Sequence, residues 1–189
     1  MITGNLEYVM CSLPYLSFRD AVEERHKVYS LFSKYANKPD NEMNLVAILD
    51  DEAEKFLRSG QFRLFKSIRL ENIHLEIFQK SDLDVIADFS NYVFQQKKGV
   101  EQLRVGRRNG TDTGSSSDQI LAINPGNPLE EEVHLLKLQW NYLEDISSGQ
   151  YDNFGALIIY KLKLLLLIRW WGFDQKQGFE NFLKIIKED

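Results

Sequence analysis

The chain has 189 residues, a formal net charge of -5 and one cysteine, Cys11. This length suits one compact unit with a substantial core. The acidic balance argues against broad electrostatic binding to nucleic acid or anionic lipid, because proteins that bind in this way usually carry a basic excess or a basic face. A single cysteine excludes an internal disulfide, and the opening residues MITGNLEYVM show no secretory signal, so we expect a cytoplasmic protein.

The first part of the chain opens with an ambiguous segment and a predicted helix. Residues 6–16 are apolar but include Pro14, and their pattern fits a strand as well as a short helix. From Phe18 to about Ala36 the apolar residues recur at near-helical spacing, and Ser17 with Asp20 resembles a capping box. We therefore predict a helix over 18–36, ended by the turn-forming segment KPDN.

Three further helices are expected before residue 105. The first runs over 42–58, with Gly60 as its C-terminal stop. The second runs over 62–78, although Ile73, Leu75 and Ile77 also alternate as in a strand. The third runs over 82–104 and begins at Asp82, a residue type favoured at helix N-caps.

Residues 106–127 differ in composition from the rest of the chain. They are rich in Gly, Ser, Asn and Asp and hold few apolar residues that would anchor them, which predicts a flexible loop or linker. The chain is therefore expected to divide into an N-terminal helical region over 1–105, this linker over 106–127, and a C-terminal three-helix unit over 128–189.

The first helix of the C-terminal unit is predicted to open at Asn127 and Pro128. It carries two apolar stripes on neighbouring faces, the first formed by Leu129, Val133, Leu136, Trp140 and Leu143, the second by Leu135, Leu138, Tyr142 and Ile146. Two stripes give this helix more apolar surface than one partner helix covers. After the second helix, a capping-box pattern at Asp174 and Gln177 begins a third helix whose inner face is Phe179, Phe182, Leu183 and Ile186.

The second helix of this unit, over 152–171, has no polar face, and a helix that is hydrophobic all round must be buried. A transmembrane span is the alternative, since the 18 residues from Phe154 to Trp171 give roughly 27 Å against a hydrocarbon core of about 30 Å. However, Lys161 and Lys163 near its middle would each cost about 2.5 to 3.5 kcal/mol at the bilayer centre. In a soluble bundle their stems pack while their ammonium groups reach water. The predicted fold class is all-α, a helical bundle with a C-terminal three-helix unit around a buried central helix.

The sequence contains no recognisable catalytic or cofactor-binding motif. It lacks a phosphate loop and a dinucleotide-binding glycine turn. His26, His74 and His134 lie far apart without cysteine partners, so we expect no metal site. We likewise expect no cofactor and no nucleic-acid partner. The apolar setting of Cys11 indicates an inert buried thiol.

Two features remain as candidate binding surfaces. Positive charge gathers just before the linker, at Lys97, Lys98, Arg104, Arg107 and Arg108. These side chains either contact an acidic partner or nucleic acid, or form a solvated helix end whose negative pole favours cations. The second feature is the aromatic group Trp140, Tyr142, Trp170 and Trp171, which either anchors an interface or fills the core.

Two stretches resemble a known family. They are SLPYLSF, residues 12–18, and the long segment from Asn127 to Trp171, with its N-P-L-E opening, its Trp140-x-Tyr142-Leu143 segment, its Tyr151-Asp152 turn and a leucine-rich helix ending in Arg169-Trp170. Together they resemble a bacterial family that is encoded beside V-type ATP synthase subunits and is similar to the C-type subunit of the central stalk.

This resemblance implies a non-catalytic helical subunit of the central stalk, which joins the membrane rotor ring to the shaft subunits and binds no nucleotide. Its partners would be other V-type ATP synthase subunits, and it would be peripheral to the inner membrane through the complex. Because apolar surface exceeds what a three-helix unit needs, we expect contacts through Leu13, Pro14, Tyr15, Phe18, Leu135, Leu138, Tyr142, Ile146 and Trp170. The alternative is a stand-alone helical adaptor that binds an unrelated protein, and the third possibility is an enzyme.

Overall fold

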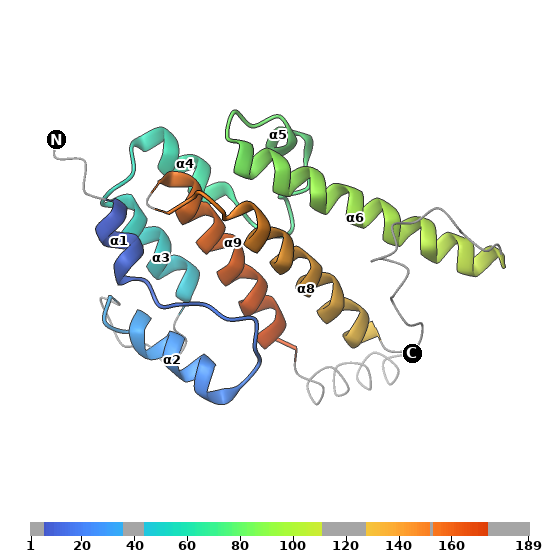
Figure 1. Ribbon diagram of the computed structural model, residues 1–189, viewed down its shortest axis with the longest axis horizontal. Helices are drawn as coiled ribbons and strands as arrows, with labels where there is room; N and C mark the ends of the chain where they lie inside the picture. The colour runs from blue at the N-terminus through green and yellow to red at the C-terminus, as the bar shows by residue number, and fades with distance from the viewer. Residues whose placement is uncertain (1–5, 36–43, 111–127, 152, 174–189) are drawn as a thin grey trace, which may run out of the picture.

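The computed structural model describes residues 6–35, 44–110, 128–151 and 153–173 (Figure 1). These residues form helices and connecting segments without a strand, so the predicted all-α class is confirmed. In chain order the helices are α1 (Leu6–Ser12), α2 (Val22–Phe32), α3 (Leu45–Glu54), α4 (Ser59–Ser67), α5 (Glu76–Gln79), α6 (Asp84–Asn109), α8 (Pro128–Ile146) and α9 (Phe154–Trp171). The open choice over 6–16 is resolved as a short helix followed by chain without regular secondary structure. Cys11 is exposed on this helix, so the expectation of a buried thiol is wrong.

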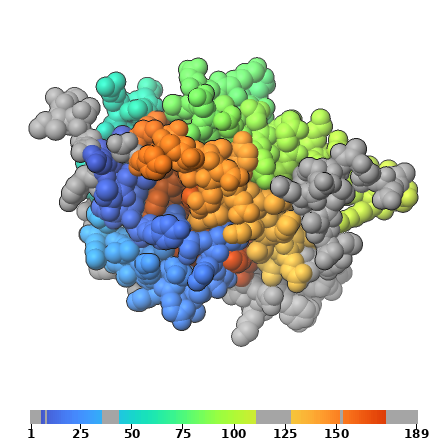
Figure 2. Space-filling model, viewed as in Figure 1, coloured from blue at the N-terminus to red at the C-terminus, as the bar shows by residue number. Residues whose placement is uncertain are grey.

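Helix α9 is the centre of the bundle, as its apolar sequence predicted. It begins after Asn153, whose side-chain oxygen accepts a hydrogen bond from the amide of Ala156 at 2.9 Å. Twelve of its 18 residues are buried, and it packs against α1, α3, α6 and α8. Figure 2 shows that α1 and α8 cover α9, of which only small parts reach this face. Because its neighbours surround it, its position is fixed by contacts on several sides.

Helices α8 and α9 form an antiparallel hairpin (Figure 1). The chain reverses through Gly149, which has a φ of 85°, a left-handed conformation that glycine adopts without strain. The first apolar stripe of α8 supplies its three buried residues, Leu136, Trp140 and Leu143. The second stripe lies towards α6, which runs beside α8 and then extends beyond the bundle to Gly110 (Figure 1).

The hydrophobic core crosses the expected boundary between an N-terminal and a C-terminal region. One cluster of buried residues joins Phe32 of α2, Leu49 of α3, Phe65 of α4 and Phe89 of α6 to the buried side chains of α8 and α9. The N-terminal helices therefore complete the burial of the central helix instead of forming a separate core.

Helix α2 is shorter than predicted. It begins at Val22 instead of Phe18, and its N-cap, Ala21, offers no side-chain oxygen. The preceding segment is held in place by tertiary contacts, because the Phe18 ring stacks on Trp170 and the indole N–H of Trp171 donates to the carbonyl of Arg19 at 3.0 Å. The predicted capping box therefore does not form.

The helix predicted over 62–78 is also wrong, because it is broken into α4 and α5. Ile68 has an extended conformation with φ -71° and ψ 119°, and both Ile68 and Ile73 are fully buried in the connection. The Asn72 side chain replaces helical hydrogen bonds there by donating to the carbonyl of Ser67 at 2.9 Å. Gly60 does not stop the preceding helix but lies in the first turn of α4.

The boundaries of two other helices differ from prediction. Helix α3 covers Leu45–Glu54 instead of 42–58, with Asn44 as its cap. Asp82 does not cap α6, which begins at Asp84 and continues to Asn109, four residues into the expected linker. It ends where Gly110 adopts a φ of 65°. The remainder of that linker, the Asn127 cap and the final helix predicted after Asp174 lie outside the described residues.

None of the helices in the described ranges combines the length and apolar character needed to cross a membrane.

Candidate functional site

Phe18 forms an aromatic cluster with Trp140 and Trp170 of the hairpin, in which Trp140 is buried and the other two rings are half-buried. The Phe18 ring lies 4.3 Å from that of Trp170 in a stacked arrangement and 5.4 Å from that of Trp140. Two lysines cover the rings, with the Lys137 ammonium 4.8 Å from the Phe18 centroid and the Lys163 ammonium 5.4 Å from that of Trp140. The structure thus brings the two predicted interface residues Phe18 and Trp170 together, against each other.

The other predicted interface residues of the N-terminal segment have different surroundings. Leu13 packs against the core, and Pro14 is buried, with its carbonyl accepting a hydrogen bond from the Tyr160 hydroxyl at 2.9 Å. Tyr15, in contrast, is 76% exposed. Of this segment, Tyr15 is therefore the large side chain most available to a partner.

The second stripe of α8 packs largely against α6 of the same chain. The Tyr142 ring stacks on Tyr92 at 4.1 Å, and Leu135 packs beside Leu103. Ile146 packs against the core, and Leu138 is half-buried. The surplus apolar surface that indicated an external partner is thus mostly used inside the fold, and contact of these residues with other subunits stays a prediction.

A buried ion pair crosses the bundle at the middle of α9. The Lys161 side chain is 1% exposed, and its ammonium donates to the Asp50 carboxylate and to the carbonyl of Phe65, each at 2.7 Å. The expectation that this ammonium reaches water is therefore wrong, because α3 and α4 close over it. Burial lowers the pKa of Lys161 and raises the pKa of Asp50. Lys163 instead lies near the surface, 3.0 Å from the Glu144 carboxylate.

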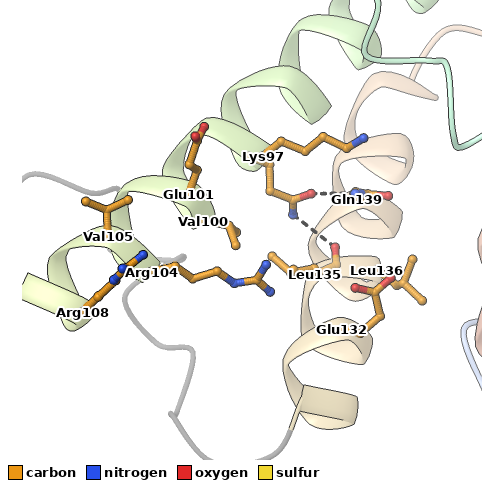
Figure 3. A pocket seen from close by; sticks show the side chains of 11 residues that line it. Lys97, Val100, Glu101, Arg104, Val105, Arg108, Glu132, Leu135, Leu136 and Gln139 are labelled. Carbon is orange, nitrogen blue, oxygen red and sulfur yellow. Dashed lines mark hydrogen bonds between the residues drawn. The ribbon is translucent and has the colours of Figure 1, made fainter. Parts of the chain in front are cut away.

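A groove of about 460 Å³ lies between α6 and α8 (Figure 3). Its apolar part is formed by Val100, Val105, Leu135 and Leu136, and its charged part by Lys97, Glu101, Arg104, Arg108 and Glu132. In Figure 3 the Arg104 side chain extends from α6 towards α8. The groove therefore combines an apolar surface with long cationic side chains that can adjust to a bound molecule.

Two glutamines hold the walls of this groove together. Gln96 is 4% exposed and donates to the carbonyl of Leu135 at 3.2 Å, while Gln139 donates to the Gln96 side-chain oxygen at 2.6 Å (Figure 3). Because both polar ends of Gln96 are satisfied, its burial fixes the register of α6 against α8 without an unpaired polar group. The groove is thus a built feature of the helix pair.

A polar cluster borders the groove beside Lys97. A second cavity of about 260 Å³ shares Lys97, Glu132, Leu136 and Gln139 with it and continues to Arg169. Arg169 donates to the Glu132 carboxylate at 3.0 Å, and the Lys97 ammonium lies 3.0 Å from the ring nitrogen Nδ1 of His74. Burial, and then the Arg169 charge, lower the pKa of Lys97, while burial and Lys97 lower the pKa of His74.

The structure separates the cations that the sequence grouped together. Lys97, Arg104 and Arg108 line the groove, whereas Arg107 pairs with Glu131 at 3.3 Å and Lys98 lies outside the groove lining. Gln96 and Gln139 were not predicted as site residues, because nothing in a local pattern shows that two polar residues 43 positions apart meet. Within the described ranges, no group of three or more His, Cys, Asp or Glu residues could hold a metal ion.

The fold defines an all-α protein, and its candidate site is a groove lined by apolar and charged side chains. Comparison with known proteins gives its family. Residues 51–188 match the family DUF2764, described as a protein of unknown function, and the chain belongs to that family. The matched range contains both helices of the groove. No curated protein and no solved structure matches the chain.

Proposed function

We propose that this protein is a non-catalytic subunit or assembly factor of a V-type ATP synthase, comparable to the C-type subunit of the central stalk. The observation that carries the proposal is the resemblance of residues 127–171 to the family of such C-like subunits. Those residues include the α8–α9 hairpin, and α9 is the buried helix around which the core is formed. The resemblance therefore concerns the part of the chain at the centre of the fold. In this proposal the protein acts through contacts with other subunits and is held at the membrane by them.

Tyr15 is the first candidate for such a contact. It belongs to the SLPYLSF segment that carries part of the resemblance, and at 76% exposed it is the most accessible of the residues predicted to contact a partner. Charged substitutions at Tyr142 would not test binding alone, because they would also disrupt its stack on Tyr92. Tyr15→Glu leaves the core untouched and is therefore the sharper variant.

The experiment is affinity purification of the tagged full chain from gently solubilised native membranes, followed by mass spectrometry. We expect the catalytic and rotor subunits of the ATPase in fixed proportion to the tagged chain. Tyr15→Glu should reduce their recovery, whereas Val22→Glu, at a similarly exposed apolar residue, should not. Recovery of the chain alone, or with unrelated proteins, would refute the ATPase assignment and favour a stand-alone adaptor.

A further inference from the structure

The cations of the groove between α6 and α8 form a row along one face of α6. Lys97, Arg104 and Arg108 are spaced by seven and four residues, and all three line the groove. At 3.6 residues per turn this spacing keeps them on one side of the helix, over about 17 Å of its length. Their charges are therefore spread along the groove instead of converging on one point.

The charge of this row is not balanced within the groove. Glu132 is engaged by Arg169, and Arg107 by Glu131, so these two acids are already matched. Among the described residues, neither Arg104 nor Arg108 has an ion-pair partner. Three cations then stand against one further acid, Glu101. In a protein of net charge -5 this is a local reversal of sign.

The apolar surface between these charges belongs to both helices. Leu135 and Leu136 of α8 lie opposite Val100 and Val105 of α6, and Val105 is half exposed. Two neighbouring helices with such a floor accept a third helix, which inserts apolar residues spaced by three and four. Helix α6 extends beyond the rest of the bundle here (Figure 1).

We propose that this groove binds an acidic, amphipathic helix of a partner protein. The helix would place its apolar residues on Leu135 and Val100 and its carboxylates beside Arg104 and Arg108. A single phosphate does not suit a row of cations about 17 Å long. Nucleic acid suits a groove with an apolar floor and the acidic side chain of Glu101 less well than a protein helix does. The inference rests on the proposed function in that the partner would be another subunit of the complex.

A defined peptide tests the proposal with the full-length protein. The probe is a fluorescent helical peptide of about 14 residues, or about 21 Å, with leucines along one face and glutamates on its flanks. A second peptide carries lysines in place of the glutamates, and a DNA duplex serves as a further probe. Fluorescence anisotropy should show binding of the acidic peptide alone, weakened by added salt.

Matched charge reversals locate the binding site. Arg104→Glu with Arg108→Glu should weaken binding of the acidic peptide by about tenfold or more, because two attractive contacts become repulsive. Lys98→Glu reverses one charge on the same helix outside the groove and should weaken binding less than about twofold, also when it is compared with Arg104→Glu alone. All three residues are exposed, so the variants should keep the circular dichroism spectrum of the parent.

Several results would overturn the inference. The lysine peptide could bind as tightly as the acidic peptide, or Lys98→Glu could weaken binding as much as the two arginine substitutions do. DNA could bind more tightly than the acidic peptide. Peptide binding could also be lost as the protein is concentrated, because a second copy of the chain then occupies the groove.

Co-purification from membranes separates this inference from the proposed function. If the Arg104→Glu, Arg108→Glu variant still recovers the ATPase subunits, the groove assignment fails while the proposed function stands. If the parent recovers none but binds the peptide through these arginines, the proposed function fails and the groove remains.

Discussion

The buried pair of Lys161 and Asp50 should make Asp50→Asn one of the most destabilising conservative changes in the chain. The substitution keeps the shape of the side chain but removes the charge that lies 2.7 Å from the Lys161 ammonium. That ammonium is 1% exposed and would retain only the carbonyl of Phe65 as a hydrogen-bond acceptor of full strength. Breaking a buried pair on one side costs about 3 to 5 kcal/mol. This is a large share of the roughly 5 to 15 kcal/mol that stabilises a typical domain.

Urea unfolding followed by circular dichroism measures this loss against two controls. Glu76→Gln breaks the exposed pair with Lys80 and should change the free energy of unfolding by less than about 0.5 kcal/mol. Adding Lys161→Met to Asp50→Asn should recover part of the loss, because no buried charge is then left without a partner. If Asp50→Asn costs no more than Glu76→Gln, or if the double variant loses the sum of both single changes, the reasoning is refuted.

The pH dependence of the Asp50→Asn variant gives a second check on the same pair. Burial lowers the pKa of Lys161, so the unfolded chain holds this proton more tightly than the folded one. Between the lowered pKa and the ordinary value of about 10.4, the unfolded state binds more protons, and stability therefore rises with pH. Removing the Asp50 charge strengthens this effect. The variant should regain stability relative to the parent as the pH is raised towards about 10.4, and a constant difference would contradict the assignment.

Four further substitutions have defined outcomes. Tyr160→Phe removes the donor to the carbonyl of Pro14 and should cost about 1 to 3 kcal/mol near neutral pH. Because burial raises the pKa of Tyr160, the parent loses stability above pH about 10, whereas the variant, which lacks the hydroxyl, does not. The difference between their free energies of unfolding in urea should therefore narrow above this pH. A difference that stays constant with pH would show that the Tyr160 hydroxyl is not the cause. Gly60 lies in a helical turn with open space around it, so Gly60→Ala should raise the melting temperature and the free energy of unfolding, the latter by about 0.5 to 1 kcal/mol. Gly149 has a φ of 85°, so Gly149→Ala should lower the melting temperature. Shifts of the same sign would show that backbone conformation does not decide the effect. Phe18→Ala should cost about 2 to 4 kcal/mol and reduce the aromatic near-UV circular dichroism, whereas unchanged stability would restore Phe18 as a surface residue.

The sequence predicted the fold best for helices that are buried on all sides or along one face. The absence of a polar face predicted the position of α9, and the first stripe of α8 correctly identified Leu136, Trp140 and Leu143 as buried. Both patterns are local, because the side chains of one helix repeat every 3.6 residues whatever covers them.

Features that depend on distant contacts were not predicted. The partner of Lys161 lies 111 residues away, and no spacing rule connects them. Phe18 was assigned to a helix because its neighbours have helical periodicity, but it lies in a non-helical segment before α2, where its ring stacks on Trp170. The groove required the register of α6 against α8, which two glutamines fix and which the order of residues along one helix does not show.

The unequal surroundings of α6 along its length have a consequence for how the chain opens in solution. Its 26 residues span about 39 Å, and five buried residues, from Val85 to Val93, tie its first half to the core. Beyond Gln96 the only buried positions of this helix are Leu103 and Gly106. Amide hydrogens of the first half should therefore exchange with solvent only when the whole bundle unfolds, while those of the last turns exchange through local opening. A molecule bound beside Arg104 would slow exchange in those last turns first, so amide exchange at the end of α6 would detect its binding.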